Sequence, residues 1–131
     1  SQECLDFMKA AYEISERFGL PVLFRTTTGV SHSKSLVSFG EREERPVPTY
    51  ARNTRKYISA PANAYQNHPK VEDALTALEE YGCTSPLNKV EINGNKIGVI
   101  TASIAYQYAR DAFPADTSFL RLGLTAHEAH P

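Results

Sequence analysis

The sequence predicts an α/β protein composed of two incomplete pieces. Helical periodicity at the start is followed by a short apolar run, and near the end a strand, a helix and another strand fit a parallel crossover. Between the two pieces lies a long stretch without either periodicity, which is hard to place inside one small domain. The pattern therefore indicates a segment that joins the end of one α/β domain to the start of another.

The front piece is predicted as a helix over residues 2–18 followed by a strand over 20–26. Ser1 is expected to cap the helix, Gly19 to end it, and Pro21 to prevent its resumption. Apolar residues at three- and four-residue spacings form one stripe: Cys4, Phe7, Met8, Ala11, Ile14 and Phe18.

The middle of the chain, from Thr27 to about His68, shows neither a long helix nor clear alternation, and several prolines interrupt it. Only "RNTRKYI" at 52–58 suggests a short turn. We predict that residues 1–45 end one domain, that 46–68 are a linker crossing a surface, and that 69–131 begin a second domain.

The back piece starts at Pro69, which fits the first turn of a helix extending to Gly82. The inward face of this helix is predicted to carry Val71, Ala74, Leu75, Leu78 and Tyr81. Asn93-Gly94 is typical of a tight turn, so strands at 89–92 and 96–101 are expected to pair as a hairpin.

After the second of these strands, Ser103 is expected to cap a helix over 104–113, and Pro114 to stop it. Its inward residues are predicted to be Ile104, Ala105, Tyr108 and Ala109. A last strand over 118–124 would complete a parallel crossover.

Composition excludes some functions. Of 131 residues, 41% are hydrophobic and 22% charged, and the formal net charge is −1, whereas nucleic-acid binders carry a basic face. No apolar run approaches the roughly 20 residues that a membrane span needs, and the first residues do not resemble a signal peptide. Cys4 and Cys83 are too few for a disulfide framework or metal cluster. We expect a cytoplasmic protein without nucleic-acid or membrane partners and without a metal site.

One polar cluster directly follows the predicted front strand: Arg25, Thr26, Thr27, Thr28, Ser31 and His32. A guanidinium binds carboxylate or phosphate through paired hydrogen bonds, hydroxyls add donors, and a histidine titrates near neutral pH. In an α/β sheet, the carboxyl end of a strand is also where ligands bind. The cluster suits an anionic 2-oxo acid or a phosphate, but an ordinary solvated turn explains the same residues.

Other polar positions carry weaker signals. The turn at 101–106 could hold an anion at a helix start, yet it has no glycine-rich phosphate motif and a structural turn is favoured. His68 has no partner ligand at helical spacing, and His127 and His130 fit the chance composition of a tail. No residue is assigned a catalytic role.

Several stretches in order resemble the α subunit of indolepyruvate:ferredoxin oxidoreductase: "FRTTTGVSHS", "PANAYQNHPKVEDALTALEEYG", "SPLNKVE", "KIGVITASIAYQYARDAF" and "SFLRLGLT". The resemblance implies an internal fragment of a thiamine-diphosphate-dependent enzyme. That enzyme oxidatively decarboxylates arylpyruvates such as indolepyruvate with coenzyme A, and its electrons pass through iron–sulfur clusters to ferredoxin. The front piece would then end a pyrimidine-binding domain, and the back piece would begin a domain similar to the C-terminal domain of transketolase.

The resemblance also implies that thiamine diphosphate, Mg and the 4Fe-4S clusters are bound elsewhere in the parent enzyme. The segment alone is therefore expected to be inactive and to hold no cofactor. Its partners would be the rest of the parent chain, a second (beta/gamma-type) subunit, ferredoxin, the 2-oxo acid and coenzyme A. Only the cluster from Arg25 to His32 is carried over, as a candidate near the substrate or coenzyme A. The alternative is a non-catalytic interaction or assembly module, and either interpretation allows a dimer through exposed strand edges.

Overall fold

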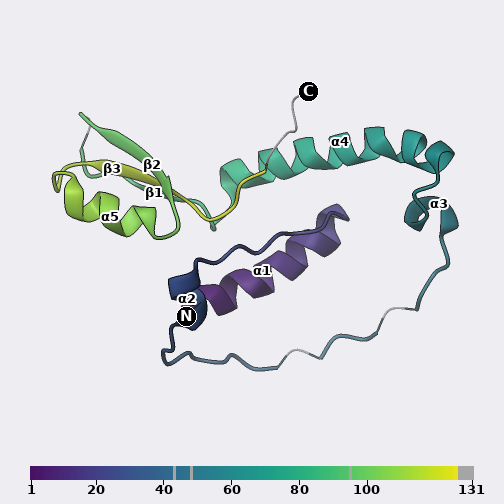
Figure 1. The fold of residues 1–131 in the computed structure, drawn as a ribbon, viewed down its shortest axis with the longest axis horizontal. Coiled ribbons are helices and arrows are strands. Elements are labelled where there is room, and N and C mark those ends of the chain that lie inside the picture. The colour runs from purple at the N-terminus through teal and green to yellow at the C-terminus, as the bar shows by residue number, and fades with distance from the viewer. Residues whose placement is uncertain (43, 48, 95, 127–131) are drawn as a thin grey trace. The chain divides into compact units, whose positions relative to one another are not determined.

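The computed structural model describes residues 1–42, 44–47, 49–94 and 96–126 (Figure 1). In chain order its elements are α1 (Gln2–Phe18), α2 (Thr28–His32), α3 (Thr54–Tyr57), α4 (Pro61–Thr84), β1 (Lys89–Glu91), β2 (Gly98–Ala102), α5 (Ala105–Ala112) and β3 (Ser118–Leu122). Mixed α/β structure, as predicted, is confirmed. The chain divides into two compact units, Ser1–Ala74 and Leu75–Pro131, so the boundary falls inside α4. Within the described residues, no helix is both long and apolar enough to cross a membrane.

Helix α1 has the predicted bounds, and five of its six predicted inward residues are at least half-buried, whereas Met8 is 39% exposed. Ile14 is buried, and Cys4, Phe7, Ala11 and Phe18 are half-buried along the same stripe. Gly19 ends the helix with φ 64°, the left-handed conformation that glycine adopts without steric cost, and its N–H donates to the Ser15 carbonyl. Ser1 occupies the N-cap position, as predicted, but its side chain makes no capping hydrogen bond.

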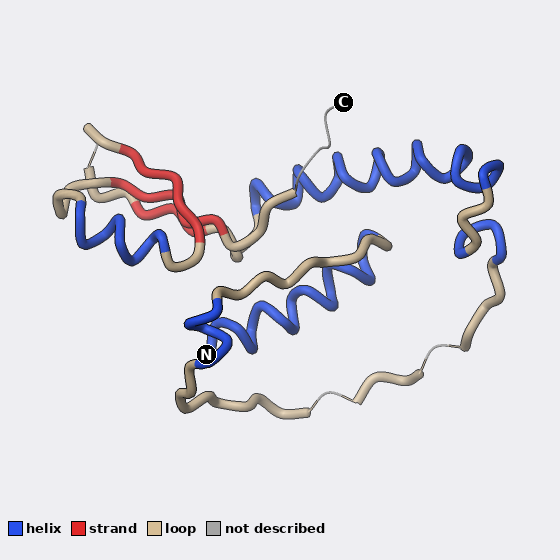
Figure 2. The backbone as a smooth tube through the Cα atoms, in the orientation of Figure 1, coloured by secondary structure: helices blue, strands red, loops and turns tan. Residues whose placement is uncertain are grey.

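Residues 20–26 are extended but do not form the predicted strand. They turn back toward the start of α1 (Figure 2), and the Ser15 hydroxyl donates to the Leu20 carbonyl. Val22 and Phe24 are half-buried, whereas Leu23 between them is 90% exposed. The alternation that suggests a strand is real, but a strand also needs a ladder of backbone hydrogen bonds. The described part of this unit contains no second strand to provide one.

The rest of the first unit is mostly irregular between α2 and α3. Gln2 makes two hydrogen bonds to this stretch: it accepts from the Ser38 N–H at 2.8 Å and donates to the Ser38 carbonyl at 3.4 Å. The short turn predicted at 52–58 is confirmed as α3, whose Lys56 N–H donates to the Asn53 side chain.

Helix α4 begins at Pro61, eight residues before the predicted start at Pro69. Pro61 fits the first turn equally well, because a helix leaves its first N–H groups unpaired. Pro69 lies inside the helix, where it cannot donate to the Tyr65 carbonyl, and Tyr65 is exposed to water that can replace the missing bond. The predicted stripe is otherwise correct: Leu78 is buried and Ala74, Leu75 and Tyr81 are half-buried, although Val71 is exposed.

The three strands of the second unit form one mixed sheet with the order β1-β3-β2. Strand β2 pairs with β3 in parallel, which confirms the predicted crossover through α5. The predicted hairpin is wrong: β1 and β2 do not pair with each other, because β3 lies between them and pairs antiparallel with β1. The Asn93-Gly94 pair indicates a turn from two neighbouring residues alone. It cannot show that β3, more than 20 residues later in the chain, pairs between β1 and β2.

Asn93 and Gly94 instead join the sheet to the turn that precedes β3. The Ser118 hydroxyl accepts from both backbone N–H groups at 3.2 Å and donates to the Gly94 carbonyl at 2.5 Å. Gly94 is not one of the described residues with positive φ. It is needed for close packing, since a Cβ there would overlap the Asp116 backbone carbonyl.

Helix α5 lies on one face of the sheet (Figure 1), but not with the predicted side inward. Ile104 and Tyr108 are 45% and 70% exposed, whereas Tyr106 is only 5% exposed. The expected Ser103 cap is also wrong: Ser103 has φ 53°, and the capping position is Ile104, without a side-chain hydrogen bond. The side that faces the sheet carries buried Tyr106 and half-buried Ala109, so only Ala109 of the four predicted inward residues is confirmed, and Ala105 is exposed.

Candidate functional site

The polar cluster after residue 24 is built around the short helix α2. Thr27 is its N-cap, and the Thr27 hydroxyl accepts from the Val30 N–H at 3.5 Å. The Ser31 hydroxyl donates to the Thr27 carbonyl at 3.1 Å and lies 2.7 Å from the Thr26 hydroxyl. Local sequence chemistry explains this turn, because threonine and serine hydroxyls are good partners for the unpaired groups at a helix start.

The structure thus brings together Thr26, Thr27 and Ser31 but not the whole predicted set. Arg25, Thr28 and His32 are exposed, and among the described residues no hydrogen bond or ion pair joins Arg25 or His32 to the three hydroxyls. The hydroxyls of Thr27 and Ser31 already bind their own backbone. What the cluster offers a ligand is therefore mainly the Arg25 guanidinium, in water, where ion pairs are weak. An anion site at this cluster stays a prediction.

The other described polar positions singled out in the sequence belong to other elements of the chain. His68 lies 3.6 Å from Glu72, one turn later on α4, and both side chains are more than half exposed. The 101–106 turn leads into α5 through Ser103. His127 and His130 lie outside the described residues. Within the described part of the chain, no three His, Cys, Asp or Glu side chains gather into a possible metal site.

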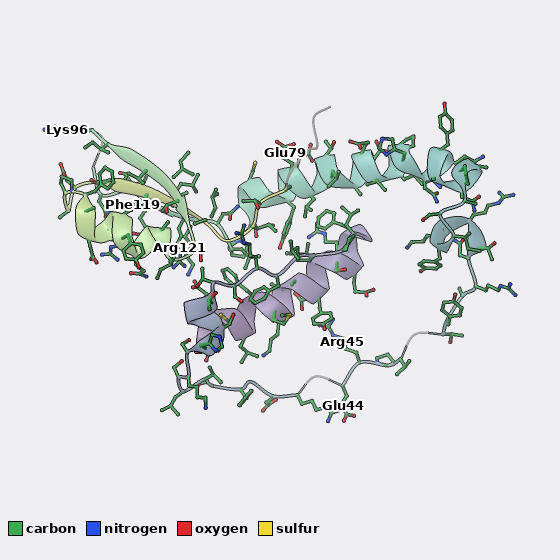
Figure 3. All side chains as sticks on the ribbon, in the orientation of Figure 1. Glu44, Arg45, Glu79, Lys96, Phe119 and Arg121 are labelled. Atoms are coloured by element: carbon green, nitrogen blue, oxygen red, sulfur yellow. The ribbon has the colours of Figure 1, made fainter. Side chains whose placement is uncertain are left out.

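A polar network that sequence patterns did not reveal lies between α5 and the sheet. The Tyr106 hydroxyl donates to Glu91 Oε1 at 2.6 Å and accepts from Arg110 Nη1 at 3.4 Å. The Arg121 guanidinium lies over the Tyr106 ring, 5.2 Å from its centroid. Figure 3 labels Arg121 and Phe119 on β3. The only sequence signal was the four-residue spacing of Tyr106 and Arg110, which places them on one helix face.

This network stabilises the packing of α5 on the sheet. Phe119 is 5% exposed and meets the Tyr106 ring edge to face, with centroids 5.7 Å apart. Glu91 is opposite Phe119 in the antiparallel register, so a carboxylate on β1 reaches the buried phenol. The Tyr106 hydroxyl is satisfied by Glu91 on one side and Arg110 on the other. The arrangement therefore holds an apolar contact in place and does not direct the phenol at a ligand.

An open hollow of about 450 Å³ lies on the opposite side of the sheet. Its lining is mainly apolar and comes from the last turns of α4, from β1 and β3, and from the residues after β3. The lining includes Glu79, Gly82, Cys83, Asn88, Val90, Leu120, Leu122 and Leu124.

Asn88 shapes one wall of this hollow. Its Nδ2 donates to the Gly82 carbonyl at 2.9 Å, and its Oδ1 accepts from the N–H groups of Gly123 and Leu124, each at 2.9 Å. One amide therefore connects the end of α4 to the chain leaving β3. Because an amide has both donors and acceptors, no other residue type of this size satisfies all three backbone groups.

Comparison with known proteins finds relatives over most of this chain. It is 36% identical over 130 residues to the indolepyruvate oxidoreductase subunit IorA of Methanothermobacter marburgensis, covering 95% of this chain and 21% of that protein. IorA of Pyrococcus horikoshii is 34% identical over 118 residues, with 85% and 18% covered. IorA of Archaeoglobus fulgidus is 29% identical over 113 residues, with the same coverage.

These relatives confirm the resemblance inferred from the sequence. The chain spans about a fifth of the length of the curated relatives it matches, so the similarity is to a segment of subunit IorA. No family model matches the chain, and no solved structure matches it.

Proposed function

We propose that this chain is a segment of an oxidoreductase that oxidatively decarboxylates arylpyruvates, indolepyruvate among them. In the proposed reaction, the 2-oxo acid loses carbon dioxide, its acyl group is transferred to coenzyme A as the aryl-acetyl thioester, and the electrons reduce ferredoxin. The observation that carries the proposal is the 36% identity to IorA of Methanothermobacter marburgensis over 95% of this chain.

The proposal gives this segment a structural role next to the chemistry. Residues 1–45 would form the end of a thiamine-enzyme-like domain, and residues 69–131 would form the start of a domain similar to the C-terminal domain of transketolase. Residues 46–68 would be the linker between these two domains. The parallel β2–α5–β3 crossover supports the second assignment.

Thiamine diphosphate, Mg and the 4Fe-4S clusters would be bound by other parts of the cytoplasmic parent enzyme. The two cysteines fall in different units, and the described side chains do not form a ligand set for a metal. We therefore assign no cofactor ligand to these residues, and we expect the isolated segment to show no turnover. The proposed partners remain the rest of the parent chain, a second beta/gamma-type subunit and ferredoxin.

The proposal is tested on the intact parent chain purified with its partner subunit under anaerobic conditions. Reduction of a viologen dye that requires indolepyruvate, coenzyme A and thiamine diphosphate together is the expected result. If a preparation with intact clusters reduces no dye with indolepyruvate, phenylpyruvate or pyruvate, the enzymatic proposal is wrong.

The candidate site is tested in the same assay with Arg25→Ala. Because Arg25 is an exposed cation that does not pair within the described chain, its removal should alter binding of an anion and leave the fold intact. We expect a rise of at least about tenfold in the Michaelis constant for the 2-oxo acid or for coenzyme A. Arg52→Ala, another exposed arginine of the first unit, is the matched control. Equal constants in the two variants would remove Arg25 from the site.

A non-catalytic assembly module is the second candidate, and one observation favours it. The face of the sheet opposite α5 carries exposed apolar side chains, among them Val90 and Ile100. Such a face is typical of an interaction surface. It is compatible with the enzymatic proposal, because a segment of a large enzyme also has to pack against the rest of it.

A further inference from the structure

The pair Asn93-Gly94, which follows β1, can undergo a chemical reaction without any enzyme. The amide carbon of an asparagine side chain can be attacked by the backbone nitrogen of the next residue. A glycine at that next position hinders the attack least, because it has no Cβ. Of the asparagines in the chain, only Asn93 is followed by glycine. The sequence therefore makes Asn93 the asparagine most prone to spontaneous deamidation.

The reaction needs no partner except water. The Gly94 nitrogen forms a bond to Asn93 Cγ, the bond from Cγ to Nδ2 breaks, and the proton of the Gly94 N–H leaves with the amide as ammonia. Water then opens the cyclic imide at either of its carbonyl groups, which gives aspartate or isoaspartate. No oxidation or reduction takes place. Asn93 is exposed, so water can reach the imide.

The fold holds both reacting groups in hydrogen bonds that oppose this attack. The Gly94 N–H, which has to lose its proton, donates to the Ser118 hydroxyl at 3.2 Å. Asn93 Nδ2 donates to the Thr117 carbonyl at 3.0 Å, which turns the amide toward the start of β3. The attacking nitrogen must be released and the side chain must rotate toward it, so both bonds have to open before the reaction.

Ser118 controls this opening more than any other described side chain. Its hydroxyl also accepts from the Asn93 N–H and donates to the Gly94 carbonyl, so one side chain fixes three backbone groups of the pair. We propose that Asn93 is a latent deamidation site, which the Ser118 hydroxyl keeps unreactive in the folded chain. This role is independent of the proposed enzymatic function, because it needs only the fold of the second unit.

Deamidation would damage the contact that had prevented it. In aspartate a carboxylate oxygen replaces Nδ2, so the Thr117 carbonyl loses its donor and faces a second acceptor. Isoaspartate adds a methylene group to the backbone between residues 93 and 94. The Asp116 backbone already leaves no room there for a Cβ on Gly94. Either product therefore weakens the connection between the end of β1 and the start of β3, and the loss is irreversible.

The test incubates the 131-residue chain at mildly alkaline pH and follows the peptide that contains Asn93 by mass spectrometry. We expect Ser118→Ala to deamidate at Asn93 about three- to tenfold faster than the unchanged chain. Asn88→Ala is the matched control, because it removes hydrogen bonds from the same unit and leaves those of Asn93 and Gly94 in place. The unchanged chain unfolded in urea should react faster than the folded chain.

A second measurement examines the damage without relying on Ser118→Ala. Asn93→Asp reproduces one product of the reaction and should unfold at a lower urea concentration than the unchanged chain. Asn53→Asp is the control, because it adds the same charge but keeps the oxygen that accepts from the Lys56 N–H. Equal unfolding midpoints in the two aspartate variants would show that deamidation does not damage the fold.

Three results would overturn the protective role of Ser118. One is an equal rate of deamidation in Ser118→Ala and the unchanged chain. Another is an equal acceleration in Asn88→Ala, which would make general stability the cause. The third is an equal rate in the folded chain and in the chain unfolded in urea. None of these results affects the dye-reduction assay on the parent chain, so the protective role and the proposed function fail separately.

Discussion

The two units of the chain are stabilised in different ways. In the first unit, one long helix and an extended segment pack along one stripe, and only Ile14 among the described apolar residues is buried. In the second unit, three strands share backbone hydrogen bonds and bury Phe119 and Tyr106 beneath α5. The difference shows that an apolar pattern makes a strand only where a partner strand exists: residues 20–26 have the pattern and remain irregular, while β3 has two partners.

Replacing the centre of the second unit should have the largest effect. Phe119→Ala removes a ring that is 5% exposed and contacts Tyr106, so we expect the free energy of unfolding of the second unit to fall by about 3–5 kcal/mol. Urea titration followed by circular dichroism measures the loss. Phe39→Ala is the control from the first unit, where the ring is 81% exposed, and it should cost less than about 0.5 kcal/mol. Equal losses would mean that the two units do not differ in burial.

Replacing Gly94 should lower stability, because the Asp116 backbone leaves no room for a Cβ atom at this position. In Gly94→Ala the new methyl group must displace the Asp116 backbone, which also positions the start of β3, so a loss of about 1–3 kcal/mol is expected. Gly82→Ala on α4 meets no atom within 4 Å and should stabilise the helix by about 0.5–1 kcal/mol. Thermal unfolding should show a lower melting temperature for Gly94→Ala and a higher melting temperature for Gly82→Ala. A neutral Gly94→Ala would contradict the close approach.

Replacing Asn88 should lower stability, because its side chain hydrogen-bonds to three backbone groups. Asn88→Ala leaves the N–H groups of Gly123 and Leu124 without an acceptor, and we expect a loss of about 1–3 kcal/mol in urea unfolding. Asn88→Asp keeps the acceptor and loses only the bond to the Gly82 carbonyl, so its loss should be smaller. A larger loss in Asn88→Asp than in Asn88→Ala would show that Oδ1 is not the important atom.

The smallest effect is expected at the phenol of Tyr106. Tyr106→Phe keeps the ring against Phe119 and removes the hydroxyl that joins Glu91 and Arg110, so a loss of about 0.5–1.5 kcal/mol is expected. Tyr108→Phe, on the exposed side of the same helix, should change nothing measurable. The melting temperatures of Tyr106→Phe and Tyr108→Phe, measured by calorimetry, distinguish the two effects. Identical melting temperatures would mean that the network adds no stability beyond the packing of the ring.

Several features encoded by neighbouring residues were predictable from the sequence, although the expected cap at Ser103 and the start of α4 at Pro69 were wrong. The stripe of α1, the Gly19 terminus, the turn that becomes α3 and the stripe of α4 depend on contacts within a few residues, and all are present. The parallel crossover was predictable as well, because the lengths of β2, α5 and β3 permit little else.

Features that depend on distant partners were not predictable. The hairpin at Asn93-Gly94 failed because β3 pairs with β1 in its place. The inward side of α5 was missed because it is set by the contact of Tyr106 with Phe119, a strand residue that the helix pattern does not reveal. In the candidate site, the capping bonds of Thr27 and Ser31 follow from local chemistry, but the network around Tyr106 needed the strand register that brings Glu91 to it.

Hydrogen exchange tests the contrast between the units most directly. Strand β3 is hydrogen-bonded to a neighbouring strand along both edges and β2 along one edge, whereas residues 20–26 lack a ladder. Exchange followed by mass spectrometry should therefore be at least about 100-fold slower in peptides covering residues 98–102 and 118–122 than in one covering 20–26. Equal protection in all three peptides would mean that residues 20–26 also belong to a sheet, which would contradict the contrast between the two units.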